Sequence, residues 1–171
     1  MDVHLVTDAV RRELRLGEVC ARFRYAVTAN DVERFALATG DRSGPWATPE
    51  DYVSGRLPAG APAPPGYYLA LDPYERGDLE VEEYLTRIPY RPTGGGNAYN
   101  HVRYARPIRV GDDITVEVSY TDAYEKDGRS GRLLFRVRQN VYLDARGAIV
   151  AESECCHIRS YDLSEEVADA R

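Results

Sequence analysis

From residue 99 onward, polar and hydrophobic residues alternate in four long runs: YNHVRYA, DITVEVSYTDAY, GRLLFRVRQNVYLD and AIVAESECCHIRSYD. Alternation with a period of two is typical of β-strands that have one covered face. The segments RPIRVGD, EKDGRSG and DARG separate these runs and contain the glycine and aspartate residues that turns favour. The pattern therefore predicts long antiparallel strands joined by two hairpins.

The first part of the chain shows shorter elements. Residues 7–15, TDAVRRELR, predict a weakly amphipathic helix that Thr7 can cap and Gly17 can end. Residues 20–27, CARFRYAV, alternate in character and predict a strand. The helix is expected to be a short lead-in to the main domain.

The clearest helix signal in the chain is TANDVERFALATG. Thr28 or Asn30 can cap its start, and Gly40 can end it. Apolar residues recur at helical spacing between them, which predicts an amphipathic helix over residues 29–39.

The middle of the chain lacks periodicity. Residues 55–66, GRLPAGAPAPPG, are rich in proline and glycine and predict a loop, and the stretch 77–98 is expected to be irregular. The glycine triplet that includes Gly95 and Gly96 indicates either a turn or a close approach of a ligand to the backbone.

Together these elements predict one α+β domain in which a helix lies across a long, curved antiparallel sheet. The 171 residues suit a single core. The expected divisions are a lead-in segment over 1–19, one domain over 20–162 and a polar tail over 163–171.

Composition excludes several classes of function. The net charge is −6 with acidic and basic residues intermixed, which argues against nucleic-acid partners and anionic membranes. No apolar run approaches the roughly 20 residues that a membrane helix needs, and the start lacks the apolar core of a secretory signal. A cytoplasmic location is therefore expected. Cys20, Cys155 and Cys156 fit neither a disulfide framework nor metal-ligand spacing, so we expect reduced thiols and no metal. No cofactor is expected either.

The run YARPIRVGDDITVEVSYTDAYEKDGRSGRLLFRVRQNVYLDARGAIVAESECCHIR, over 104–159, resembles the later strands of MaoC-like dehydratases. The segments RPIRVGD and EKDGRSG, the DARG hairpin and the helix VERFALATGD are especially similar to the first-half domains of two-part members of that family. The resemblance covers roughly residues 20–160 and implies the hotdog fold.

In catalytic members of this family, the helix runs into a motif of the form G-D-x-N-P-aliphatic-H, whose aspartate and histidine bind the water that adds to an enoyl thioester. This chain has Gly40 and Asp41 in the first two places, but Ser43, Gly44 and Trp46 replace the asparagine, proline and histidine. Asp41 is the expected catalytic remnant, and Ser43 and Trp46 are expected to border the acyl pocket. The opposing interpretation is a simple helix end capped by Gly40.

Other candidates follow from residue type. His101 can serve as a base if the fold returns it to the pocket, and otherwise it is a surface residue of a strand. Arg103 and Arg106 can contact the phosphates of a thioester carrier, or can lie on the solvent face. Gly95 and Gly96 are expected to allow close approach of the substrate. His4, His157 and Asp112 are expected to have structural or solvated roles.

The resemblance implies a subunit of an enoyl-CoA or enoyl-ACP hydratase or dehydratase. This subunit would shape the substrate site, lack the full Asp/His pair and work as a homodimer or heterodimer with a second hotdog. Two alternatives remain open. One is a stand-alone hotdog enzyme of a natural-product pathway, in which Asp41 and pocket tyrosines direct a cyclisation, isomerisation or thioester hydrolysis. The other is a non-catalytic module that binds acyl thioesters. The excess of 13 tyrosines over 3 phenylalanines suits pockets and interfaces, although tyrosine also favours strands.

Overall fold

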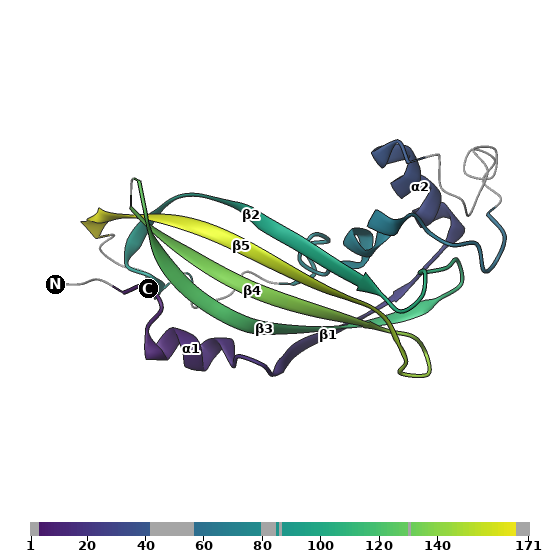
Figure 1. Ribbon diagram of the computed structural model, residues 1–171, viewed down its shortest axis with the longest axis horizontal. Coiled ribbons are helices and arrows are strands. Elements are labelled where there is room, and N and C mark those ends of the chain that lie inside the picture. The colour runs from purple at the N-terminus through teal and green to yellow at the C-terminus, as the bar shows by residue number, and fades with distance from the viewer. Residues whose placement is uncertain (1–3, 42–56, 80–84, 86, 130, 167–171) are drawn as a thin grey trace.

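The computed structural model describes residues 4–41, 57–79, 85, 87–129 and 131–166. Five strands form one antiparallel sheet: β1 (Val19–Ala26), β2 (Tyr90–Tyr104), β3 (Asp113–Gly128), β4 (Gly131–Leu143) and β5 (Ile149–Glu166). Their order is β1-β3-β4-β5-β2, so β1 and β2 are the edges. Figure 1 shows these long strands side by side. The predicted α+β class with a long antiparallel sheet is confirmed.

Both predicted hairpins are present. β3 joins β4 at the EKDGRSG segment, where Gly128 pairs with Gly131. β4 joins β5 at the DARG segment, where the backbone N–H of Gly147 donates to the carbonyl of Asp144 at 2.9 Å. Gly147 has a φ of 78°, a conformation that favours glycine. Local turn chemistry therefore set the connections among the last three strands.

In the described part of the chain, three helical segments accompany the sheet: α1 (Asp8–Leu14), α2 (Ala29–Thr39) and the 3₁₀ helix η1 (Pro65–Leu71). The hydroxyl of Thr7 accepts from the N–H of Val10 at 3.3 Å, and that of Thr28 accepts from the N–H of Asp31 at 3.1 Å. Gly40 ends α2 with a left-handed φ of 69°. These caps confirm both predicted helices, but α1 ends at the left-handed Arg15 and not at Gly17 as predicted. None of the described helices is long and apolar enough to cross a membrane.

One face of the sheet is covered, and its apolar side chains fall into two clusters. The η1-side cluster packs η1 and α2 against the sheet and includes Tyr67, Leu71, Val116 and Tyr142. The α1-side cluster packs α1 against the other end and includes Val10, Leu14, Leu134 and Tyr161. Figure 1 shows α1 and α2 at opposite ends of the sheet. The short η1 thus covers the sheet beside α2.

Strand β2 differs most from the prediction, because it begins at Tyr90 and runs through the glycine triplet. The predicted turn at residues 94–96 is therefore wrong. A Cβ at Gly95 would lie 2.9 Å from the carbonyl oxygen of Ile158 on β5, closer than real Cβ atoms approach. Glycine at this position therefore permits close pairing with β5, which sequence periodicity does not reveal.

The described part of the predicted lead-in segment, residues 1–19, packs against the sheet, and part of the predicted tail, residues 163–171, belongs to the sheet. Leu5, Val10 and Leu14 are buried in the α1-side cluster. β5 extends to Glu166, so residues 163–166 of the expected tail lie in a strand.

Candidate functional site

The helix end that carries the degenerate motif is partly described. Asp41 directly follows the left-handed Gly40 and is half-buried. A cleft between α2 and η1, lined by Phe35, Ala38 and Tyr67 among others, lies just before this helix end and has a volume of about 510 Å³. Ser43 and Trp46 lie outside the described residues. The predicted placement of Asp41 and Trp46 beside a cleft remains a prediction.

His101 and Arg103 lie on the face of the sheet opposite η1. Tyr104 identifies the covered side of β2, because its hydroxyl donates to the carbonyl of Pro65 in η1 and its ring lies 6.5 Å from that of Tyr68. Side chains alternate along a strand, so His101, three positions earlier, points the other way. It is exposed and pairs across strands with Glu154. The structure therefore does not bring His101 to the η1 side, where α2 leads to Asp41.

The side chain of Arg106 is occupied by structural contacts. Its guanidinium donates to both oxygens of Asp112, at 2.7 and 3.2 Å, and lies 3.7 Å from Asp144. The hydrogen bond to Asp112 raises the pKa of Arg106, and the nearby negative charge adds to this. The backbone N–H of Arg109 also donates to Asp112 at 2.8 Å. The RPIRVGD segment is thus a closed turn held by its own arginine and aspartate.

A small apolar cavity lies beside this turn. It has a volume of about 290 Å³ and is lined by Arg106, Pro64, Pro65, Tyr104 and Ile108 among others. Its position between η1 and the end of β2 lets an apolar group approach the covered face of the sheet. Gly95 and Gly96 lie farther back along β2, opposite Arg159 and Ile158 of β5.

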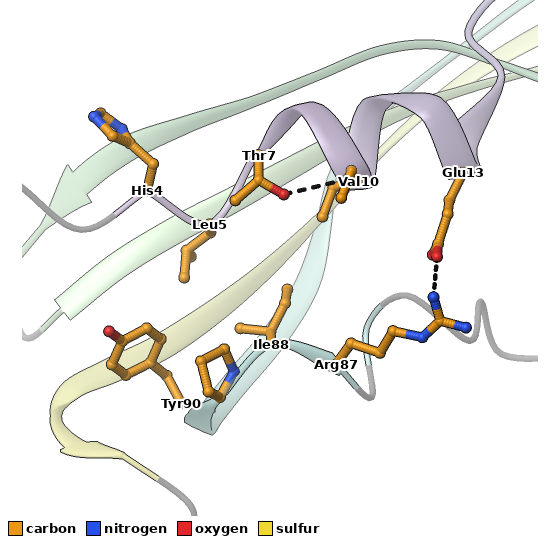
Figure 2. A pocket seen from close by; sticks show the side chains of 10 residues that line it. His4, Leu5, Thr7, Val10, Glu13, Arg87, Ile88 and Tyr90 are labelled. Atoms are coloured by element: carbon orange, nitrogen blue, oxygen red, sulfur yellow. Dashed lines mark hydrogen bonds and ion pairs between the residues drawn. The ribbon is translucent and has the colours of Figure 1, made fainter. Parts of the chain in front are cut away.

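A second apolar pocket of about 290 Å³ lies at the α1 end of the sheet. Figure 2 shows Leu5 and Val10 from the lead-in pointing toward Ile88, just before β2, and Tyr90, the first residue of β2. An ion pair between Glu13 and Arg87, drawn as a dashed line, crosses its rim. This pocket is at the opposite end of the molecule from α2.

Polar residues interrupt the buried face between the two apolar clusters. Along β4, Leu134 belongs to the α1-side cluster and Tyr142 to the η1-side cluster, and the same face carries Arg136, Arg138 and Asn140 between them. With buried polar residues from β5 and the turn after η1, they form what we call the polar band: Asp72, Arg136, Arg138, Asn140, Ser153 and His157. A polar layer inside a core is stable only if most of its groups are paired.

Asp72 organises the centre of the polar band. One nitrogen of Arg138, Nη2, donates to both oxygens of Asp72 at 2.8 Å, and the amide nitrogen of Asn140 donates to one of them at 2.9 Å. Asp72 and Arg138 are 2 % and 1 % exposed, respectively. The pairing offsets the desolvation of both charges and fixes the turn after η1 to β4.

His157 lies under Tyr74 at the edge of the polar band. Their ring centroids are 4.4 Å apart, and the guanidinium of Arg138 lies 4.9 Å from the same tyrosine ring. Burial, together with the positive charges of Arg138 and Arg136, lowers the pKa of His157 to about 4. The imidazole is therefore neutral at pH 7.

Cys155 Sγ lies 3.3 Å from His157 Nε2. Burial raises the pKa of this thiol to about 11, although Arg138 acts in the opposite direction. A neutral thiol beside a neutral imidazole lacks the thiolate that nucleophilic catalysis requires. This pair is therefore a structural hydrogen bond and not an activated nucleophile.

The sequence analysis missed the polar band. Arg136, Arg138 and Asn140 alternate with Leu133, Phe135 and Val137 of the same strand, so local periodicity assigns the polar set to solvent. In the structure the polar set is buried on the covered face instead, and Leu133 and Phe135 are half-buried on the opposite face. The sequence feature that could have indicated a buried charged partner is Asp72, an acidic residue directly after the apolar segment YYLAL.

Comparisons with known proteins agree with this architecture. The family described as FAS1-like, dehydratase domain region matches residues 15–153. No curated protein sequence gives a significant match.

Among solved structures, a chain of the ChsH1-ChsH2 complex from Mycobacterium tuberculosis is similar with a TM-score of 0.69 and 16% identity, over 95% of this chain and 96% of that one. A chain of the HadBC (3R-Hydroxyacyl-ACP Dehydratase) complex from the same organism has a TM-score of 0.58 and 17% identity, over 80% and 92%. The MaoC-like dehydratase from Rhodospirillum rubrum has a TM-score of 0.53 and 21% identity, over 85% and 93%.

These similarities confirm the hotdog fold that the resemblance to MaoC-like dehydratases implied. Because the family match spans most of the residues, the chain belongs to the FAS1-like dehydratase domain region family of MaoC-like hotdog proteins.

Proposed function

We propose that this chain is the substrate-shaping subunit of an enoyl-CoA or enoyl-ACP hydratase or dehydratase, and that a second hotdog supplies the complete Asp/His pair. The observation that carries the proposal is the placement of His101 on the face opposite η1, away from the covered side of the sheet. His4 bonds to Glu125 near α1, and the ring of His157 packs against that of Tyr74. Asp41 therefore has no histidine placed to complete the proton transfers of hydration.

Two of the structurally similar proteins support a second subunit, because each belongs to a complex of two different chains: ChsH1-ChsH2 and HadBC. In this chain, the edge strand β2 presents the surface for such a partner. It is 15 residues long and exposed along most of its length. The outer edge of such a strand offers N–H and C=O groups that another strand can pair with. The partner is a second copy or a different hotdog, and we place the pair in the cytoplasm.

The contact surface can be tested with matched edge substitutions. Val102 on β2 and Val19 on β1 are 38% and 42% exposed. Val102→Glu should weaken association at least tenfold, measured by light scattering or titration with the partner, because it places a charge in the interface. Val19→Glu, on the other edge, should leave association unchanged. Equal effects of the two substitutions would contradict pairing along β2.

The activity itself is tested by assaying enoyl-thioester hydration with the chain alone and in a complex with a hotdog that carries an intact Asp/His pair. We expect turnover from the complex only, and Asp41→Asn should change that turnover less than about twofold. Turnover of about 1 to 1000 per second by the isolated chain, as in ordinary enzymes, would overturn the proposal.

A stand-alone enzyme is the second candidate, and the polar band favours it because hydrogen-bonding groups inside the covered layer can direct chemistry on an oxygenated substrate. In that case Asp41→Asn should cut the turnover of the isolated chain by about 100-fold, the scale of a lost general acid or base. Tight binding of an acyl thioester without turnover in either assay would instead identify a binding module.

A further inference from the structure

The polar band contains buried hydrogen-bonding atoms that no other described residue pairs. Arg138 uses only Nη2 to hold Asp72, and its Nε and Nη1 atoms have no hydrogen-bond partner among the described residues. Asn140 uses its amide nitrogen, and its Oδ1 atom likewise has no partner in the described part of the chain. Both residues are 1% exposed. Unpaired buried donors and acceptors are rare and unfavourable in folded proteins, so these three atoms require an explanation.

The side chains that carry these atoms are neighbours, because Arg138 Nη2 and the amide nitrogen of Asn140 both donate to Asp72 Oδ2, at 2.8 and 2.9 Å. The unpaired set comprises two donors on a cation and one carbonyl-type acceptor. Asp72 already balances the charge of Arg138, so a neutral ligand group fits better than a further anion. A hydroxyl accepts from the guanidinium and donates to the amide oxygen, and it therefore satisfies both side chains.

The ring of Tyr74 covers this part of the polar band. Its ring lies 4.9 Å from the guanidinium of Arg138 and 4.4 Å from the imidazole of His157, yet Tyr74 is 37% exposed. The backbone of its turn is fixed independently, since the N–H of Asp78 bonds to Pro73 at 2.8 Å. Rotation of the tyrosine side chain toward solvent would therefore open a space the size of its ring beside Arg138 and leave this backbone bond in place.

We propose that Arg138 and Asn140, beneath Tyr74, bind a hydroxyl group on the acyl chain of the ligand, beyond the carbons next to the thioester. The inference rests on the proposed function, because it takes the ligand to be an acyl thioester. It assigns the chain a preference for oxygenated acyl groups over plain alkyl groups. A site built to hydrogen-bond a hydroxyl discriminates against the analogue that lacks it, since its own buried groups are then left unpaired.

Binding measurements test the preference directly. Octanoyl-CoA and its single-hydroxyl derivatives at carbons 4 to 8 are titrated calorimetrically into the purified chain, and into its complex with a hotdog partner. We expect one hydroxyl position to tighten binding about tenfold or more. If octanoyl-CoA binds and no derivative binds more tightly, the inference is overturned while the proposed function stands. If no acyl-CoA binds to the chain or to the complex, both fall.

Two variants locate the site. The first variant is Asn140→Leu. The second combines Asp72→Asn with Arg138→Met and so removes the buried ion pair as a unit. Each should reduce the preference for the hydroxylated acyl-CoA over octanoyl-CoA to within about twofold. Their affinity for octanoyl-CoA should stay within about twofold of wild type, which also shows that they fold. The assignment would be overturned if the preference survived in both variants. Ordered waters bonded to these three atoms in a crystal structure of the ligand complex would lead to the same conclusion.

A matched pair of tyrosine variants tests the cover. Tyr74→Ala should speed association of the preferred hydroxylated probe about threefold or more, measured by stopped-flow fluorescence. Tyr124→Ala removes a ring that stacks on Phe135 across β3 and β4, away from the polar band, and should leave the rate unchanged. Equal rates for wild type and Tyr74→Ala would refute the role of Tyr74.

Discussion

The buried imidazole of His157 should make the protein sensitive to mild acid. Its pKa is lowered from 6.5 to about 4, first by burial and then by Arg138 and Arg136 on the neighbouring strand. Cys155 on the same strand, whose pKa burial raises to about 11, carries no negative charge at pH 7 that would favour a protonated ring. Protonation is therefore much less favourable in the folded state than in the unfolded chain.

The sign and the size follow from these two pKa values. Between about pH 6.5 and pH 4 the unfolded chain binds the proton and the folded protein does not, so stability falls as the pH is lowered through this window. For a pKa of 6.5 in the unfolded state and about 4 in the folded state, the loss between pH 7 and pH 5 is about 2 kcal/mol.

Urea unfolding at pH 7 and pH 5 measures this contribution. His157→Gln removes the titrating group, so its unfolding free energy should fall by about 2 kcal/mol less than that of wild type over the same interval. Carboxylates contribute equally to both proteins and cancel in the difference. His101→Gln, which removes an exposed imidazole, is the matched control for loss of a histidine. Equal acid losses for His157→Gln and wild type would refute the buried, neutral state of His157.

Three further predictions concern stability, and each is checked by chemical or thermal unfolding. Asp72→Ala leaves a buried guanidinium without its carboxylate and should cost about 3 to 5 kcal/mol, whereas a loss below about 1 kcal/mol would mean that the ion pair is hydrated. Gly131→Ala places a Cβ 2.1 Å from the carbonyl oxygen of Tyr161, so it should destabilise the protein much more than Gly147→Ala, where φ is also positive but no atom lies within 4 Å. Thr28→Ala removes the cap of α2 and should cost about 1 kcal/mol, and an unchanged midpoint would show that the cap is dispensable.

The sequence by itself determined the elements whose signals are local. Thr7 and Thr28 marked the starts of α1 and α2 because an N-cap needs only a hydroxyl beside the helix it caps. Gly40 marked the end of α2 because few other residues adopt its left-handed conformation. The alternation in β3, β4 and β5, with turn residues between them, was enough to predict two hairpins and a long antiparallel sheet.

The tertiary structure decided which face of each strand is covered and which distant residues meet. Periodicity shows that a strand has two different faces, but the segment that packs on it chooses the buried one. In β4 the turn after η1 selects the face of Arg138, because Asp72, 66 positions away in sequence, supplies the charge that makes its burial tolerable. His101 was assigned to a strand correctly, but its direction depends on Tyr104 packing against η1. The glycine triplet became part of β2 because the backbone of β5 lies close beside it, a contact that only the folded sheet provides.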